Sequence, residues 1–270
     1  MRYLAEIGYN GYDYHGWQRQ PKALTIQEVV ERNLSALLGT HVPCIGCGRT
    51  DAKVHASQFF FHFNTSSPLD FNLKFRLNKM LPSSIAVFNV SPISHNFHAQ
   101  HSAISRTYNY LIHTDSNPYL NEFSSLYPLD FDIEKMQEAA MLITKQDDFI
   151  SFCRSPSRHK STECKMESID CFSSLNGRLL RFQFTANRFL QGMIRLLMQR
   201  LIDVGTGELS LAELCEILSS KHPAKNAKSA YPQGLHLTRV KYSMKDFDAE
   251  PFQASAFTPI MDISWEKIKP

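Results

Sequence analysis

The first part of the chain switches between apolar patterns of strand period and helix period. Residues 3–9 alternate loosely, as a strand does. Apolar side chains then repeat at helical spacing from Ile26 to Leu38, with a capping-box pattern at Thr25 and Glu28 and a glycine stop at position 39. Further strands are predicted at residues 43–47, 57–63 and 85–90, and a second helix at residues 71–80. The order strand, helix, strand, strand, helix, strand is that of a ferredoxin-like unit.

The remainder of the chain nearly repeats this order. Asn176-Gly177 is the strongest short turn signal, and it predicts a hairpin. The predicted strands are residues 103–113, 163–173, 178–185 and 234–242, and the predicted helices are residues 132–143, 188–204 and 211–218. We therefore predict an α+β fold of two related halves, residues 1–95 and 96–245, followed by a tail of residues 246–270. Such halves commonly place a ligand-binding cleft between them.

The composition adds few constraints. The chain has 270 residues, of which 43% are hydrophobic and 20% charged, as in ordinary globular proteins. It contains no run of about 18 apolar residues that would span a membrane, and its N-terminus lacks the apolar core of a signal peptide. We therefore expect a cytoplasmic protein without membrane partners, whose six cysteines are reduced thiols.

The net charge of +3 does not by itself indicate nucleic-acid binding, so the local distribution of basic residues matters more. The segment from Arg154 to Lys165 also contains Arg158 and Lys160, against the single acid Glu163. A solvated surface loop and a flexible phosphate-binding loop both fit this pattern.

The densest group of reactive side chains lies between the predicted strands at residues 43–47 and 57–63. Arg49, Asp51, Lys53 and His55 place one carboxylate among two cations and an imidazole. Nearby cations keep a carboxylate ionised, and an ionised carboxylate can act as a nucleophile. Charge alone favours a simpler alternative, an incidental surface ion pair between Arg49 and Asp51.

Arg195 is unusual because its predicted helix is apolar on nearly every side, which is typical of a buried helix. Arg188, Gly192, Arg195 and Gln199 form the polar stripe of this helix. A buried arginine requires a carboxylate or phosphate partner.

Several segments stand out by their order and spacing along almost the whole chain. They are Asn10-Gly11-Tyr12-Asp13-Tyr14-His15-Gly16-Trp17-Gln18-Arg19-Gln20, Thr25-Ile26-Gln27-Glu28, Gly48-Arg49-Thr50-Asp51-Ala52-Lys53-Val54-His55-Ala56, Phe97-His98-Ala99, Arg106-Thr107-Tyr108-Asn109-Tyr110, Asn187-Arg188-Phe189-Leu190, Met193-Ile194-Arg195 and Gly234-Leu235-His236-Leu237. Together they closely resemble the motifs of the tRNA pseudouridine synthase A family, and the set is specific where one motif alone would be weak.

The resemblance implies an architecture and an activity. The two ferredoxin-like (RRM-like) halves would form a merged, mainly antiparallel sheet with a central catalytic cleft. The protein would be a homodimer that needs no cofactor and no metal, and Phe59-Phe60-Phe61 could supply part of its interface. It would isomerise uridine to pseudouridine in the anticodon stem-loop of tRNA, at tRNA positions 38, 39 and 40.

The resemblance also implies roles for individual residues. Asp51 would be the nucleophile, Arg49 would help to extrude the base, and Tyr108 would contact the uridine. Arg195 would be the partner of Asp51 across the cleft between the halves. Strand alternation puts Arg106 on the same face as Tyr108, so we also expect it at the substrate. The substrate would further be bound by basic residues of the loop described above, namely Arg154, Arg158 and Lys160.

Some positions depart from the family pattern. Lys53 stands where the family has glycine, so it adds a cation beside Asp51 and restricts the backbone. Gln191-Gly192 replaces an aromatic or histidine pair, and residues 161–165 lack an expected arginine.

Other interpretations of the sequence remain. Cys44-x-x-Cys47 and the triplet His95, His98 and His101 could bind a metal, although structural thiols and solvated or hydrogen-bonded histidines fit their contexts better. A non-catalytic RNA-binding protein or a tRNA-folding chaperone could use the same scaffold. Asp51 argues against simple binding, because a carboxylate would repel phosphate.

Overall fold

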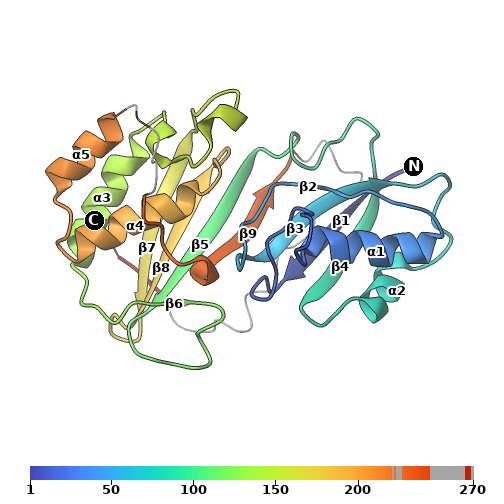
Figure 1. Ribbon diagram of the computed structural model, residues 1–270, viewed down its shortest axis with the longest axis horizontal. Helices are drawn as coiled ribbons and strands as arrows, with labels where there is room; N and C mark the ends of the chain where they lie inside the picture. Colours follow the sequence, from blue (N-terminus) through green and yellow to red (C-terminus); the bar gives the residue numbers. More distant parts are fainter. Residues whose placement is uncertain (221, 223–226, 244–264, 269–270) are drawn as a thin grey trace. The chain divides into compact units, whose positions relative to one another are not determined.

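The computed structural model describes residues 1–220, 222, 227–243 and 265–268 (Figure 1). The predicted tail, residues 246–270, therefore lies outside the described residues except for positions 265–268. The chain forms two compact units. Unit 1 contains Met1–Arg106 and a segment that begins at His236, and unit 2 contains Thr107–Leu235 and a segment that begins at Ile263.

Unit 1 has the predicted order of strands and helices. Its elements are β1 (Arg2–Tyr9), α1 (Ile26–Leu38), β2 (Ile45–Gly46), β3 (His55–Asn64), α2 (Leu73–Met80), β4 (Ile85–Ile93) and β9 (Leu235–Lys241). The strand order is β9-β3-β1-β4. β1 pairs antiparallel with both β3 and β4, whereas β9 pairs in parallel with β3 through His55 and His236. The strand that the sequence predicts at residues 234–242 is present as β9, and from His236 onwards it belongs to unit 1.

The helix α1 begins and ends where the sequence predicts. The Thr25 side chain accepts a hydrogen bond from the Glu28 backbone N–H, and Gly39 adopts the left-handed conformation that ends many helices. The apolar stripe of α1 is buried, including Ile26, Val30 and Leu34 at 0% exposure. Local capping and tertiary burial thus specify the same helix.

Both faces of β3 are buried within unit 1. Phe59 and Phe61 lie on one face under Trp17, whose ring centroid is 4.1 Å from that of Phe59. Phe60 points the other way and meets the Tyr242 ring edge-on at 5.3 Å. The three phenylalanines are at most 2% exposed, so they cannot supply the dimer interface for which the sequence makes them candidates.

Unit 2 is a second α+β unit. It contains β5 (Ser105–His113), β6 (Ser125–Leu126), α3 (Ile133–Thr144), β7 (Met166–Ser174), β8 (Leu179–Ala186), α4 (Met193–Gly205), α5 (Leu211–Ser219) and β10 (Glu266–Lys267). The strand order is β10-β7-β8-β5, and β7 pairs antiparallel with β8. The predicted turn at Asn176-Gly177 is confirmed, with both residues at positive φ.

Three features of unit 2 differ from the prediction. The helix expected at residues 188–204 begins only at Met193, because Gly192 is in the left-handed conformation. The strands β6 and β10 were not predicted, since two residues are too few to show an alternation.

The α+β class with mainly antiparallel pairing is confirmed. Within the described ranges, no helix is long and apolar enough to cross a membrane.

A buried histidine should make the stability of unit 1 depend on pH. His62 on β3 is 1% exposed, and its Nδ1 accepts a hydrogen bond from the Ala99 N–H at 3.1 Å. Burial, with a smaller effect of Arg2 and His98, lowers its pKa from 6.5 to about 4. Since the unfolded state then binds the proton more readily, the contribution of neutral His62 is complete above pH 6.5 and is lost as the pH falls towards 4.

We therefore expect His62→Asn to flatten the dependence of the free energy of unfolding on pH. The free energy of unfolding of the wild type, minus that of the variant, should fall by about 2 kcal/mol from pH 7 to pH 4.5. Urea unfolding of both proteins at several pH values measures this difference. Parallel curves would show that His62 is not the group that titrates.

Candidate active site

Asp51 lies in the loop of unit 1 that leads from β2 into β3. Its side chain is partly exposed, whereas Thr50 before it and Val54 after it are buried. The Thr50 hydroxyl is 2.9 Å from the hydroxyl of buried Tyr9 on β1. The loop is therefore anchored to the sheet just before Asp51.

A second loop, residues 11–17, holds the backbone on both sides of Asp51. The Trp17 N–H donates to the Thr50 carbonyl at 3.2 Å, and the Lys53 N–H donates to the Tyr14 carbonyl at 3.0 Å. The Val54 N–H donates to the carbonyl of Asp51 itself at 3.2 Å, which closes a tight turn. These bonds fix the backbone from which the carboxylate projects.

Two glycines make the close approach of these loops possible. Gly16 has φ +86°, and a Cβ at this position would lie 2.2 Å from the Thr50 carbonyl oxygen. A Cβ on Gly11 would lie 2.0 Å from the Val54 carbonyl oxygen. Both obstacles are backbone atoms that cannot move aside independently, so any other residue would push the two loops apart.

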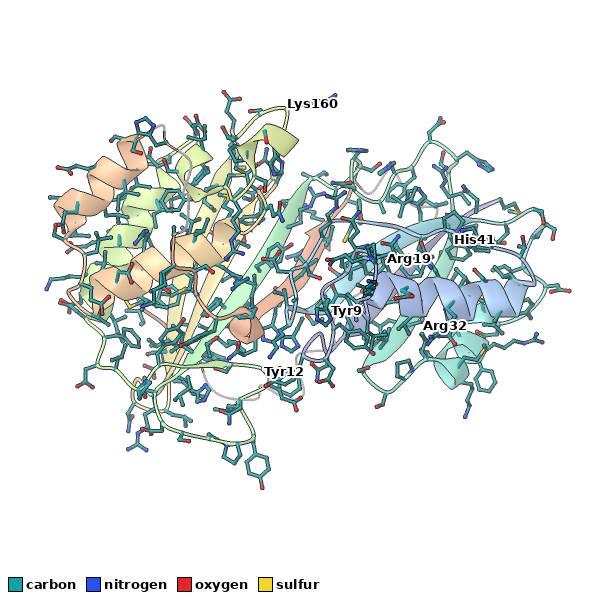
Figure 2. All side chains as sticks on the ribbon, in the orientation of Figure 1. Tyr9, Tyr12, Arg19, Arg32, His41 and Lys160 are labelled. Carbon is teal, nitrogen blue, oxygen red and sulfur yellow. The ribbon has the colours of Figure 1, made fainter. Side chains whose placement is uncertain are left out.

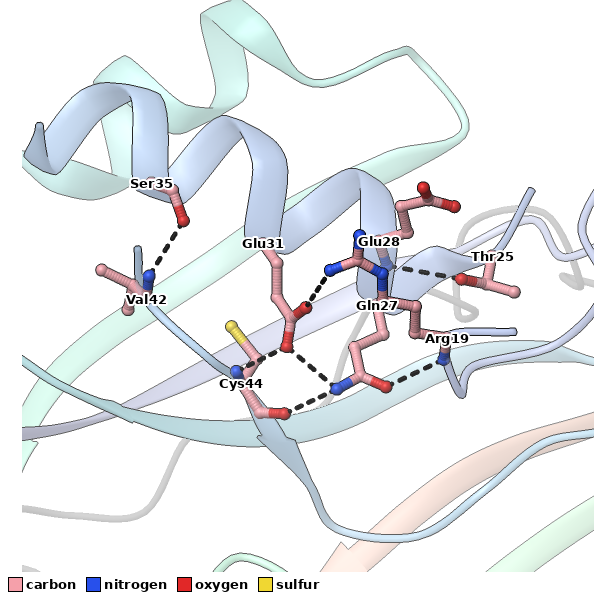
Figure 3. Close-up of polar contacts among 8 residues, drawn as sticks. All are labelled: Arg19, Thr25, Gln27, Glu28, Glu31, Ser35, Val42 and Cys44. Atoms are coloured by element: carbon pink, nitrogen blue, oxygen red, sulfur yellow. Dashed lines mark hydrogen bonds and ion pairs between the residues drawn. The ribbon is translucent and has the colours of Figure 1, made fainter. Parts of the chain in front are cut away.

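Arg19, which follows this loop, is in turn bound to α1 (Figure 3). The Gln27 side chain accepts from the Arg19 N–H at 3.0 Å, and its Nε2 donates to the Glu31 carboxylate at 2.9 Å. Buried Glu31 also accepts from the Cys44 N–H at 2.8 Å and forms a 3.8 Å ion pair with Arg19. The network ties α1, the residues before β2 and the loop against Asp51 into one rigid assembly.

Lys53 has a backbone conformation that lysine rarely adopts. Its φ is +65°, in the left-handed region that glycine enters without strain. Its ammonium group lies 4.7 Å from the centroid of the Tyr12 ring, a cation–π contact that offsets part of the strain. The glycine of the family pattern thus corresponds to a backbone requirement, which this chain meets with lysine.

Arg49 is exposed at the edge of the loop. Among the residues that the structure describes, it forms no ion pair with Asp51. Arg49 and Asp51, both within the described ranges, therefore do not form the surface ion pair that charge alone favours.

Arg106 holds backbone in unit 1. Its guanidinium donates to the carbonyls of Ala103 at 3.0 Å, Gln100 at 2.6 Å and Cys47 at 3.2 Å. The last of these fixes the segment that enters the Asp51 loop. Arg106 thus has a structural task, and its expected contact with substrate remains a prediction.

Tyr108 and Arg195 lie in unit 2. Tyr108 on β5 is 9% exposed, and its ring meets Phe189 edge-on at 5.2 Å. Arg195, in the first turn of the largely buried helix α4, donates from Nε to the Ala230 carbonyl at 2.8 Å and from Nη2 to the Ser229 hydroxyl at 3.2 Å. The expected approach of both residues to Asp51 remains a prediction.

The basic loop of unit 2 presents Arg154 and Lys160 as exposed side chains. Lys160 is labelled in Figure 2. Arg154 reaches the Ser229 hydroxyl at 2.7 Å. Arg158 lies in a short 3-10 helix, Pro156–Arg158, but its side chain is outside the described part of the structure.

The cysteines and histidines that the sequence offers as possible metal ligands are accounted for by burial and hydrogen bonding. Cys44 and Cys47 are buried free thiols, and burial raises the pKa of Cys44 well above its usual value and that of Cys47 to about 11. Burial therefore favours the protonated thiol at both positions, as in structural cysteines. The His98 Nδ1 accepts from the backbone of Gln100 and His101. Where the chain is described, no group of three potential ligands could hold a metal ion.

Sequence reasoning missed Glu31 and Ser229 as supporting residues. Glu31 is one more acid on an amphipathic helix, and its burial depends on Cys44 and Gln27, which meet it only in the fold. Ser229 has no local signal at all. Gly11 and Gly16 belong to a motif of the sequence, but only the structure shows which atoms their side chains would strike.

The close approach of the two loops can be tested with alanine at Gly16. Gly39→Ala is a matched control, because Gly39 also has positive φ (+67°) but nothing within 4 Å of the position that a Cβ would occupy. The control should cost about 1 kcal/mol for left-handed backbone alone. Gly16→Ala should cost at least about 2 kcal/mol more, since a backbone clash is added.

Urea unfolding at neutral pH measures both losses. Equal losses at the two glycines would show that the Thr50 carbonyl does not constrain position 16.

Comparison with known proteins places this chain in a family. A tRNA pseudouridine synthase family model matches residues 139–243. The tRNA pseudouridine synthase A of Parabacteroides distasonis is 34% identical over 252 residues, which cover 92% of this chain and 99% of that protein. The corresponding protein of Azobacteroides pseudotrichonymphae is 36% identical over 89% of this chain and 96% of its own length. That of Caldicellulosiruptor bescii is 35% identical over 88% and 98%. With this identity over nearly the full length of each relative, the chain belongs to the tRNA pseudouridine synthase A family of isomerases.

Proposed function

We propose that the protein converts uridine to pseudouridine in the anticodon stem-loop of tRNA, with Asp51 as nucleophile and without a cofactor. The observation that carries the proposal is the fixed backbone around Asp51. The loop at residues 11–17 forms backbone hydrogen bonds with the residues on both sides of Asp51. Preorganisation of this kind is what a reacting carboxylate requires. The names of the relatives, each a tRNA pseudouridine synthase A, supply the reaction and the substrate class.

The reaction is an isomerisation, and its atoms balance without a co-substrate. The bond from ribose C1′ to N1 of the base breaks, and a bond from C1′ to C5 forms. A proton leaves C5, and N1 gains one. Because no electrons are gained or lost overall, amino-acid side chains suffice for every step.

Asp51 would engage the flipped-out uridine at the sugar or at the ring. The base must leave the helical stack before either carbon can be reached. Exposed Arg49, two residues before Asp51, is suited to enter the space that the base vacates. Its guanidinium could also stack against neighbouring bases.

Tyr108 would contact the flipped base, and its phenolic oxygen would take the C5 proton as the hydroxyl passes its own proton on, so that the tyrosine ends neutral. Its ring is held edge-on against Phe189, so only limited rotation is available to it. A tyrosine that is packed in this way can still present its hydroxyl at the surface of the core.

Arg195 would stabilise the carboxylate of Asp51 and orient it. The guanidinium emerges from a largely buried helix and is fixed by two oxygens of the Ser229–Ala230 segment. A guanidinium whose plane is fixed in this way is well suited to bind a carboxylate or a phosphate.

The basic loop would bind the RNA backbone. Arg154 and Lys160 are exposed there, and Arg158 and Arg106 complete the predicted substrate-binding set. Phosphate contacts of this type position the RNA without reading its sequence. We further propose a homodimer that acts in the cytoplasm at tRNA positions 38, 39 and 40.

A non-catalytic RNA-binding protein or tRNA-folding chaperone is the alternative. The rigid support of a carboxylate in the loop disfavours it, because a phosphate-binding surface gains nothing from a negative charge held in place.

The test uses tRNA transcribed with uridine that carries tritium at C5. Asp51→Asn should lower the release of tritium at least about 10³-fold, because it removes the nucleophile while keeping the shape of the side chain. Binding of tRNA, measured by filter retention, should stay within about threefold of wild type, since this side chain is not used for phosphate contacts.

Asp70→Asn is the control, an exposed acid of unit 1 outside the loop. Full release by Asp51→Asn would refute the nucleophile role. Binding without release by the wild type would favour the chaperone.

A further inference from the structure

Two arginines of unit 2 converge on one hydroxyl group. Arg154 Nη2 donates to Ser229 Oγ at 2.7 Å, and Arg195 Nη2 donates to the same oxygen at 3.2 Å. Arg195 also donates from Nε to the neighbouring Ala230 carbonyl at 2.8 Å. Nε and Nη2 lie along one edge of the guanidinium. Hydrogen bonds from this edge to two adjacent residues, a clamp on Arg195, fix the plane of the guanidinium.

The segment that carries Ser229 is itself held firmly. The Ala230 N–H donates to the Arg195 carbonyl at 3.0 Å, so the clamp is tied to the helix that it serves. The hydroxyl of fully buried Tyr110 lies 2.8 Å from the Tyr231 carbonyl oxygen. The Tyr231 N–H donates to the Tyr127 hydroxyl at 3.2 Å. Ser229 therefore acts from a fixed backbone rather than from a free loop.

Arg154 approaches the same hydroxyl over the beginning of α4. Its backbone N–H donates to the Gln191 carbonyl at 3.2 Å. A Cβ on Gly192 would lie 3.0 Å from Arg154 Cδ, so the absence of a side chain there leaves room for the arginine stem. The Ser229 hydroxyl oxygen accepts a hydrogen bond from each of the two arginines, so both guanidinium groups point at the same atom.

We propose that Ser229 is a positioning residue of the isomerisation, which acts through Arg195. Its hydroxyl and the Ala230 carbonyl set the plane in which the Arg195 guanidinium faces the reacting groups. The proposal rests on the proposed function, because it assigns Ser229 an effect on that reaction. Arg154, by contrast, meets RNA at the surface and affects binding.

Steady-state rates of tritium release, measured over a range of concentrations of C5-labelled tRNA, separate these roles. Ser229→Ala should lower the rate at saturating tRNA about tenfold, the usual effect of losing a hydrogen bond to a charged group. It should change the half-saturating tRNA concentration less than about twofold. Ser229→Thr keeps the hydroxyl and should restore the rate to within about threefold of wild type. Arg154→Ala should mainly raise the half-saturating concentration.

Two further variants show through which arginine Ser229 acts. In the Arg154→Ala background, Ser229→Ala should still lower the saturating rate about tenfold. Ser173→Ala, a half-exposed serine of β7 with no side-chain hydrogen bond in the described contacts, is the control for loss of a hydroxyl and should match wild type. Thermal unfolding of each variant shows whether a loss of rate reflects a loss of fold.

The outcomes separate this inference from the function on which it rests. No release by the wild type overturns the proposed function. Normal release by the wild type and an equal rate for Ser229→Ala and Ser173→Ala overturn only the role of Ser229. Loss of the Ser229 effect in the Arg154→Ala background would also overturn it, because the hydroxyl would then act through Arg154.

Discussion

The contact between Gly16 and the Thr50–Asp51 peptide is the constraint on which the candidate site depends. The two backbones approach so closely that no side chain fits between them. The approach brings the Trp17 N–H to the Thr50 carbonyl and the Tyr14 carbonyl to the Lys53 N–H. It also seats the Trp17 ring on Phe59 in the core of unit 1. The conformation of a surface loop is thereby fixed by core packing, which explains how the backbone that carries a partly exposed carboxylate is held in place.

Residues far from Asp51 support this contact. Glu31 and Gln27 of α1 bind the backbone of Arg19 and Cys44, so the loop at residues 16–19 cannot move without breaking hydrogen bonds to α1. In unit 2, the clamp on Arg195 is built by the same means, with a short segment fixed to the helix and to buried tyrosine hydroxyls. In each unit, hydrogen bonds thus fix the part of the chain that presents a charged group, namely the backbone around Asp51 in unit 1 and the Arg195 guanidinium in unit 2. Lys53 shows that the scheme tolerates some strain, since a cation–π contact replaces the freedom of glycine.

The sequence predicted those parts of the fold that depend on local pattern. The capping box and the apolar stripe defined α1 to the residue, and Asn176-Gly177 located the β7–β8 hairpin. The order of the motifs indicated the family and made Asp51 the candidate nucleophile. What the sequence could not show depends on contacts between distant segments. The parallel pairing of β9 with β3 joins residues 55 and 236, and no local pattern encodes that register.

The start of α4 and the supporting residues were missed for a related reason. Gly192 interrupts an apolar pattern that otherwise predicts a helix from residue 188, and only its left-handed backbone reveals the break. Glu31 and Ser229 are ordinary polar residues until the fold brings partners to them. Arg106 was expected at the substrate because it shares a strand with Tyr108, yet its hydrogen bonds to three carbonyls give it a structural task that alternation could not foresee.

The central claim is that the placement of the Asp51 carboxylate, and not only its charge, makes this loop catalytic. The most direct measurement is the single-turnover rate of C5 tritium release by Asp51→Glu, which keeps the charge but moves it by about one methylene length. Displacement of a reacting group by about 1 Å commonly costs about 100-fold in rate, so we predict a loss of at least that size with unchanged tRNA binding. A rate within about threefold of wild type would contradict the account, because it would show that a negative charge anywhere near this position is sufficient.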